Sequence, residues 1–280
     1  MSSDSNGRKP DSPGSGTAPS PSRAGVRVAS AWGPPRDALA AVHNLEALLR
    51  STAVSQKTIL DLVPELRSSA EVLRRVVDTA RDDKDVKGEV SAYGSVRVSE
   101  LDALLDAAEA GRVDRHHLAS RAGVLADELE AVIDLLALLD LAESPVSTDV
   151  GLDFIAREAG RTSGTARGRE VVVRFDGADP DRPVSVDPYM LGALLALLVA
   201  CVQSSGAESL VLRARAGDRP RFLVEPSTSA DAALPSLSIR VMAHIAPSER
   251  AARRVAEQLG GALELADGRG SITLPSGSND

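Results

Sequence analysis

A stripe of apolar residues that recurs every seven positions constrains this chain more than any other feature. Ile59, Leu66, Leu73 and Ala80 have this spacing, and further apolar residues lie between them on the same face of a helix. A heptad spacing is typical of long helices that pack along one another. The sequence therefore predicts a long helix over residues 37–82 with one apolar seam.

A second heptad pattern lies further along the chain. Leu125, Val132 and Leu139 are spaced by seven and predict a helix over residues 114–143. Between the two helices the pattern weakens, so we expect an elaborated loop over residues 86–110 that ends in a short helix.

Two such helices can pack as an antiparallel hairpin, but one hairpin leaves much apolar surface exposed. We therefore expect a homodimer in which each copy supplies two helices to a four-helix bundle. The alternative is that both helices pack onto the C-terminal part of the same chain.

The pattern of the chain changes at about residue 145 from helical to mixed α/β. Strands are expected over residues 170–175, 210–214, 222–225, 262–265 and 271–274, and helices over residues 150–160, 188–204 and 247–259. This alternation predicts a sandwich of a sheet and helices. The expected organisation is a tail over residues 1–35, a helical domain over residues 36–144 and an α/β domain over residues 145–280.

Composition excludes several kinds of partner. Only 2% of the residues are aromatic and the net charge is −8, which opposes base stacking and binding to a phosphate backbone, so we expect no nucleic-acid partner. The longest apolar run, Met190–Val202, is shorter than the roughly 20 residues that a membrane-spanning helix needs. Residues 1–35 are rich in Ser, Pro and Gly and lack the apolar core of a secretory signal. They are expected to be disordered, and the protein is expected to be cytoplasmic without a membrane anchor.

Several segments, in the same order, resemble sensor histidine kinases over residues 37–275. Val132–Leu139 is similar to the family's stretch before its interdomain linker, and Pro183–Pro188 resembles the strand and Asp-Pro start of its nucleotide-binding helix. Arg253–Gly261 and Gly270–Pro275 resemble its closing helix, Gly-Gly turn and last strand. The resemblance implies an α+β fold in which a DHp-type helical hairpin precedes an α/β sandwich of the GHKL (HATPase) type.

The resemblance also shows which nucleotide ligands are replaced. In the family's nucleotide-binding helix an asparagine holds the Mg²⁺ that bridges the ATP phosphates, and the matching positions here are Ala196 and Ala200. Alanine has no oxygen, whereas Mg²⁺ requires near-octahedral oxygen ligation. The resemblance therefore implies that the metal of the nucleotide site is lost.

The two glycine-rich boxes of the family are replaced as well. Glu225, Ser227 and Ser229 stand where an Asp-x-Gly-x-Gly box would accept from the adenine amino group and let the nucleotide approach the backbone. Ser248 lies where a glycine-rich phosphate box is expected, next to the carboxylate of Glu249. The comparison implies that the chain binds no ATP, no metal and no other cofactor.

The phosphoacceptor is also replaced. A Pro-Glu-Leu-Arg segment resembles the family's His-Glu-Leu-Arg motif, with Pro64 in the place of the reactive histidine. His43 could instead carry phosphate in a relay, although it is followed by Asn44 where a carboxylate would act as acid or base; the alternative is an ordinary half-exposed helix residue. His116 and His117 are adjacent and fit a solvated helix start, so no metal site is expected there.

Three functions stay open. The first is a pseudokinase or scaffold of a two-component system, which forms a homodimer and binds a response-regulator receiver domain or a partner kinase. The second is a histidine phosphotransferase that uses His43. The third is a diverged ATPase or an unrelated helical adaptor. For the first two we expect docking on the outer side of the helices around residues 43–73.

Overall fold

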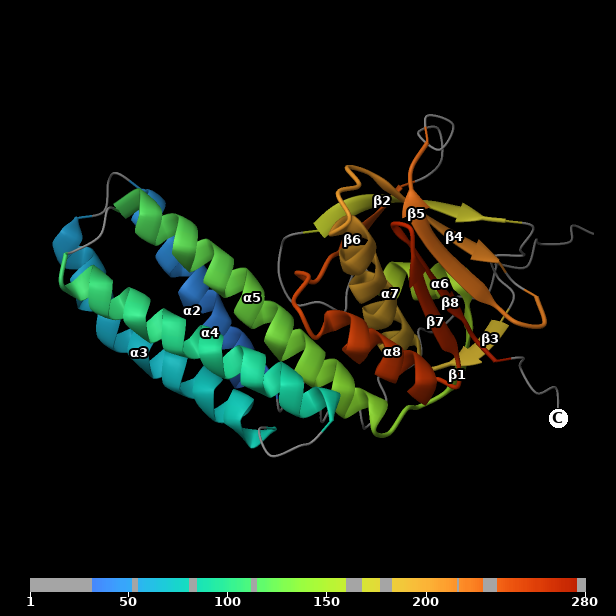
Figure 1. Ribbon diagram of the computed structural model, residues 1–280, viewed down its shortest axis with the longest axis horizontal. Coiled ribbons are helices and arrows are strands. Elements are labelled where there is room, and N and C mark those ends of the chain that lie inside the picture. The colour runs from blue at the N-terminus through green and yellow to red at the C-terminus, as the bar shows by residue number, and fades with distance from the viewer. Residues whose placement is uncertain are drawn as a thin grey trace, which may run out of the picture.

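Four long helices that pack side by side form the first half of the protein (Figure 1). The computed structural model describes residues 32–51, 55–80, 85–111, 115–159, 168–176, 183–215, 217–228 and 236–275. Most of the tail expected over residues 1–35 lies outside this part of the chain. The helices of the bundle are α2 (Gly33–Arg50), α3 (Gln56–Thr79), α4 (Val86–Glu109) and α5 (Arg115–Ala142).

The single helix expected over residues 37–82 is two helices, α2 and α3. The end of α2 is fixed by a residue from the start of α5, because Arg115 donates from Nε to the carbonyl of Leu49 (2.7 Å) and from Nη2 to that of Leu48 (2.8 Å). The last carbonyls of a helix lack the usual partner one turn further on, and that of Leu48 also accepts from the backbone N–H of Ser51 at 3.2 Å. Ser55 then caps α3 by accepting a hydrogen bond from the backbone N–H of Thr58 at 3.1 Å.

The prediction of a loop over residues 86–110 was wrong, because this segment forms α4. Small residues line the packed face of this helix, among them Ser91 and Gly94, both buried. A Cβ added at Gly94 would lie 2.7 Å from Cγ1 of Val132 and 3.1 Å from Val77, so α4 approaches α3 and α5 closely. Small residues do not add to an apolar heptad pattern, and the pattern therefore looked weak.

All four helices of the bundle come from one chain. Their seams are buried within it, as the exposure of 4% or less at Leu66, Leu73, Leu125 and Val132 shows. The exposed hairpin surface from which a homodimer was inferred is therefore covered by helices of the same chain. The homodimer stays a prediction, and an interface between copies would have to use the outer faces of the bundle.

The second half of the chain is an α/β sandwich. Its main sheet has the strand order β6-β2-β4-β5-β8-β7; β2 and β4 are parallel and the other neighbours are antiparallel. The strands of this sheet are β2 (Gly168–Phe175), β4 (Leu210–Arg215), β5 (Arg221–Pro226), β6 (Ser236–Arg240), β7 (Ala262–Ala266) and β8 (Arg269–Thr273). Three helices accompany it, α6 (Leu152–Ala159), α7 (Pro188–Gln203) and α8 (Ser248–Gln258).

Two short strands and one edge strand were not expected as such from the pattern of residues alone. β1 (Thr148–Gly151) pairs antiparallel with β3 (Pro183–Val186), so the helix expected over residues 150–160 begins only at Leu152. β6 lies in a stretch for which no strand was predicted. The α+β class, a helical domain followed by an α/β sandwich, is confirmed.

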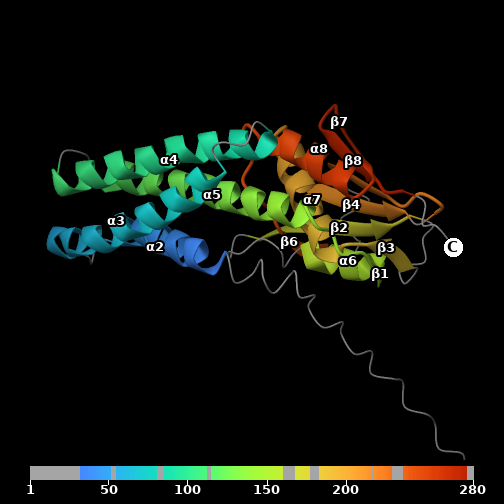
Figure 2. The same ribbon diagram turned by 90° about the horizontal axis from the view of Figure 1, so that it is seen from below.

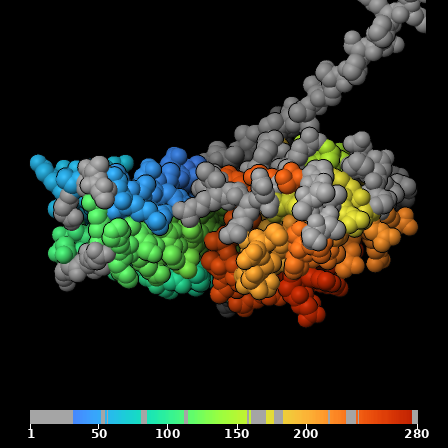
Figure 3. Space-filling view, turned by 90° about the horizontal axis from the view of Figure 1, so that it is seen from above, coloured from blue at the N-terminus to red at the C-terminus, as the bar shows by residue number. Residues whose placement is uncertain are grey.

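The bundle and the sandwich share one hydrophobic core. α8 lies beside the ends of α4 and α5 in both ribbon views (Figures 1 and 2), and α5 also contacts α7. Arg250 of α8 forms an ion pair with Glu89 of α4, with Nη1 and Oε1 2.7 Å apart. In the space-filling view the green end of the bundle abuts the orange and red part of the sandwich (Figure 3).

None of the helices in the described ranges is long and apolar enough to cross a membrane.

The buried seam generates a prediction about stability. Leu73→Asp should unfold the bundle of a single chain, because a carboxylate in an apolar core costs several kcal/mol unless it takes up a proton. The matched control is Leu60→Asp on the same helix, where the leucine is 38% exposed and the change should stay within about 0.5 kcal/mol. Thermal melts followed by circular dichroism compare the two. A folded Leu73→Asp protein with unchanged melting temperature would contradict the intrachain bundle.

Candidate functional site

The helix that the sequence analysis compared with a nucleotide-binding helix is α7. Asp187 caps it by accepting from the backbone N–H groups of Tyr189 and Met190, both at 3.1 Å. The other carboxylate oxygen of Asp187 accepts from the backbone N–H of Val146 at 2.9 Å, which attaches the segment after α5 to the start of α7. The beginning of α7 is thus fixed relative to the bundle.

The alanines at the family's ligand positions are core residues. Ala196 is 0% exposed and Ala200 is 3% exposed, and their neighbours along α7 are buried as well. The helix presses directly on the sheet, because a Cβ added at Gly270 of β8 would lie 2.4 Å from Cδ1 of Leu198. This part of α7 offers a ligand neither an oxygen nor an exposed surface.

Glu225 lies on the opposite face of the sheet from α7. In β5 the side chains alternate, and Val224, which pairs with Gly270, faces α7 and is fully buried. The carboxylate of Glu225 is held on the outer face by Arg213, whose Nε lies 2.5 Å from Oε1, and by Arg269, whose Nε lies 3.7 Å from Oε2. The structure therefore does not bring Glu225 together with Ala196 and Ala200.

The serines of the two replaced boxes serve local structure. Ser227 donates its backbone N–H to the carbonyl of Ser209 at 3.0 Å, and Ser229 lies outside the described residues. Ser248 is fully buried at the start of α8. Its hydroxyl accepts from the backbone N–H of Ile245 at 3.0 Å, and its own N–H donates to the Ile245 carbonyl at 2.9 Å. This hydroxyl is therefore committed to the turn that precedes α8.

A polar cavity of about 250 Å³ lies at the C-terminal end of α7, between His244, the start of α8 and the β7–β8 turn. Cys201 lines it, and burial raises the pKa of its thiol to about 12, with the nearby carboxylate of Glu249 adding to the rise. The thiol is thus protonated at neutral pH and is no nucleophile. Glu249 and Asp267 line the cavity together with Arg269, so it combines both signs of charge.

Charged residues run along the contact between α2 and α5, which we call the α2–α5 seam. Arg36 Nη2 lies 3.3 Å from Asp134 Oδ1, and His43 Nε2 lies 3.5 Å from Glu130 Oε2. Further along, the Glu46 carboxylate lies against Gly123, where a Cβ would come within 2.6 Å of its Cδ. The seam therefore combines Asp134 and Glu130 of α5 with Arg36, His43 and Glu46 of α2.

The structure places the predicted histidine in this seam. The side chain of His43 is 19% exposed and faces α5, and its Nε2 is buried without a hydrogen-bond partner among the described residues. The residue that follows His43 is Asn44, and the carboxylate beside the imidazole of His43 is that of Glu130 from another helix. Pro64, at the family's histidine position, lies exposed within α3, where water can satisfy the carbonyl that its missing N–H leaves unpaired.

Comparison with known proteins gives likeness in fold only. No family model and no curated protein matches the sequence. Among solved structures, the fold resembles the Acinetobacter baumannii histidine kinase AdeS (TM-score 0.41, 12% identity, 65% of this chain and 96% of that chain). It also resembles the blue-light activated histidine kinase EL346 of Erythrobacter litoralis (TM-score 0.28, 20% identity, 66% and 64%) and a histidine kinase from Burkholderia phymatum STM815 (TM-score 0.31, 20% identity, 76% and 95%).

All three are histidine kinases. The likeness concerns the order and type of the elements, and at these identities and scores it transfers no residue role to this chain.

Asp134 makes stability depend on pH. Burial raises the pKa of its carboxyl from 3.8 to about 7, with Glu130 adding to the rise while Arg36 and Arg240 oppose it. Between these values the folded chain holds a proton that the unfolded chain releases, so stability falls as pH rises from about 4 to 7.

The variant Asp134→Asn should abolish this slope, because an amide stays neutral at every pH, and should be more stable than the wild type at pH 8 by up to about 4 kcal/mol. The control is Asp106→Asn on α4, whose carboxylate is 61% exposed and whose loss should leave the slope unchanged. Denaturant unfolding at pH 5, 6, 7 and 8 measures both. A wild-type slope that survives in Asp134→Asn would show that another group is responsible.

Proposed function

We propose that this protein is a histidine-kinase-like signalling module that acts in the cytoplasm by binding other proteins and does not use ATP. The observation that carries the proposal is the position of Ala196 and Ala200, which lie in the core of the sandwich where a nucleotide site would need an oxygen ligand and an opening. Glu225, paired on the other face of the sheet, supports the same conclusion. A protein of this fold without nucleotide chemistry retains its surfaces for binding.

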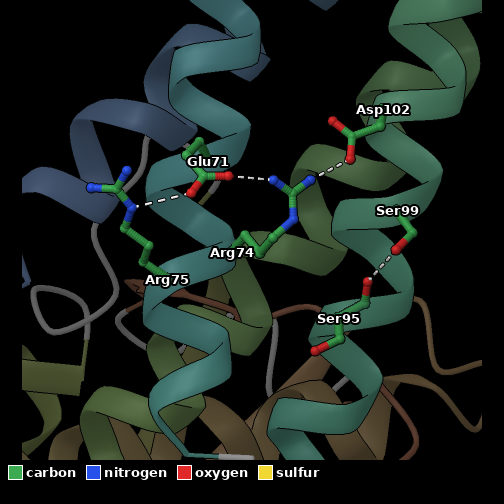
Figure 4. A network of polar contacts seen from close by, with 6 residues as sticks. All are labelled: Glu71, Arg74, Arg75, Ser95, Ser99 and Asp102. Carbon is green, nitrogen blue, oxygen red and sulfur yellow. Dashed lines mark hydrogen bonds and ion pairs between the residues drawn. The ribbon is translucent and has the colours of Figure 1, made fainter.

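The outer face of α3 and α4 is our proposed docking surface. It carries a network in which Arg74 bridges Glu71 of its own helix, at 2.5 Å, and Asp102 of α4 (Figure 4). One end of the face also exposes Leu60 and Pro64. An apolar spot beside paired charges has the composition of a protein contact, in which the apolar part supplies affinity and the charges supply orientation.

A receiver domain or a partner kinase is the proposed occupant of this face. A homodimer belongs to the proposal as well, and light scattering on the 29.2 kDa chain reports it in the samples used for binding.

Phosphotransfer through His43 is the second candidate. The proximity of Glu130 favours it, because a carboxylate beside the imidazole can orient it and act as acid or base. The burial of Nε2 weighs against it, because a nitrogen without solvent contact cannot reach an aspartyl phosphate on a partner unless α2 and α5 separate. Phosphotransfer from a phosphorylated receiver to the wild type, lost in His43→Gln, would establish this function.

The nucleotide prediction is tested in two ways. Calorimetry with Mg-ATP should show no binding with a dissociation constant below about 100 μM, which corresponds to about −5.5 kcal/mol. Ala196→Asn should lower stability by about 2–4 kcal/mol, because an amide is forced into the core without a partner. At a water-filled nucleotide site the same change would be tolerated. Gln203→Asn, at the half-buried end of α7, is the control and should be nearly neutral.

The docking prediction uses exposed residues on opposite sides of the bundle. Leu60→Asp on α3 should weaken binding of a receiver domain or partner kinase at least tenfold, because it places a charge in the apolar spot. Val124→Asp is the matched control, since Val124 is 43% exposed on α5, and α5 lies diagonally across the bundle from α3. Pull-down and surface-binding measurements compare the two variants. Equal effects of both, or no binding to any receiver or kinase of the same cell, would favour the helical-adaptor alternative.

A further inference from the structure

Three potential metal ligands from two helices converge in the α2–α5 seam. His43 projects from α2, while Asp127 and Glu130 project from α5, where a spacing of three residues places them on one side of the helix. One ligand atom of each residue lies within 4.8 Å of the ligand atoms of the other two. All three side chains are partly buried, so the group is not a set of freely solvated surface charges.

Two atoms of this group, His43 Nε2 and Glu130 Oε2, already have the spacing of two ligands of one ion. His43 Nε2 and Glu130 Oε2 are 3.5 Å apart. A tetrahedral ion with bonds of about 2.0–2.2 Å to nitrogen and oxygen separates neighbouring ligand atoms by about 3.3–3.6 Å. The ligand atom of Asp127 lies within 4.8 Å of both others, so a shift of its side chain is needed to complete the set.

His43 supplies a second, independent observation. Its Nε2 is buried and forms no hydrogen bond with any described residue. Buried polar atoms normally have a partner, because an unpaired one loses its hydration without compensation. In this position Nε2 points at carboxylate oxygen without donating to it. A metal ion between the nitrogen and the two carboxylates would give Nε2 a partner.

We propose that His43, Asp127 and Glu130 bind a divalent transition-metal ion, with Zn²⁺ the best fit. One imidazole and two carboxylates are a ligand set that suits Zn²⁺, with water in the fourth position, whereas Mg²⁺ and Ca²⁺ prefer oxygen ligands alone. Arg240 of β6 attracts Glu130 electrostatically, so the ion must displace this interaction. This competition also favours a metal with high affinity for imidazole over a hard cation. The bound ion would link α2 to α5.

The experiment uses the full chain after treatment with a chelator, and Co²⁺ as a probe that reports its own coordination. The wild type should bind one equivalent of Co²⁺ with the visible absorption of a four-coordinate site, and Zn²⁺ should abolish this absorption by displacement. His43→Ala and Glu130→Gln should each weaken binding at least tenfold. Zn²⁺ should raise the melting temperature of the wild type but not that of His43→Ala.

The matched control is the double variant His116→Ala, His117→Ala. These histidines are exposed at the start of α5, so metal bound there would be adventitious. The control should bind like the wild type. Binding lost in the control and kept in His43→Ala would overturn the proposal, as would a wild type that binds neither Co²⁺ nor Zn²⁺ below about 100 μM, a dissociation constant equivalent to about −5.5 kcal/mol. Circular dichroism confirms that each variant is folded. Metal binding and partner binding are measured separately, so either proposal can fail alone.

Discussion

The burial of the second half of α5 on all sides is the constraint on which the rest of the structure depends. Residues 131–139 are buried without a break, including the charged Asp134. A helix that is apolar all round must be covered by other elements on every side. Here α2 and α4 cover it from the bundle, and α7 and α8 cover it from the sandwich. The two halves therefore form one core, and the position of α7 and α8 relative to the bundle follows from this helix.

The sequence predicted the parts of the fold that depend on large, regularly spaced apolar residues. The seam of Ile59, Leu66 and Leu73 and the continuous apolar run of α7 were found because their pattern is local. α4 was missed because it packs through small residues, as the short distance from Gly94 to Val132 shows. The break between α2 and α3 was missed because Arg115, which binds the last carbonyls of α2, lies far from them in the sequence.

The residues of the candidate sites were likewise predictable only where a local pattern identifies them. The replaced positions Ala196 and Ala200 could be named from a local motif, and the face of Glu225 could have been derived from the alternation of Phe222 and Val224 in β5. The contact of His43 with Glu130 could not be predicted in this way. Glu130 reaches it only because α2 is a separate helix that packs along α5, and a single helix over residues 37–82 hides that pairing. The sequence therefore predicted no metal ligand set at His43.

For the signalling role proposed above, the α2–α5 seam is the part of the structure on which an input would act. The middle of α7 offers no group that can change charge or ligand, because Ala196 and Ala200 are fixed in the core. The α2–α5 seam is different, because its groups can change charge or ligand: Asp134 has a pKa near 7, and His43, Asp127 and Glu130 are placed to share an ion. Asp127, Glu130 and Asp134 belong to α5, the helix that the bundle and the sandwich share, and His43 faces them from α2. A change in the α2–α5 seam therefore acts on a helix that packs against both halves of the molecule, whereas a change at α7 would first have to open the core.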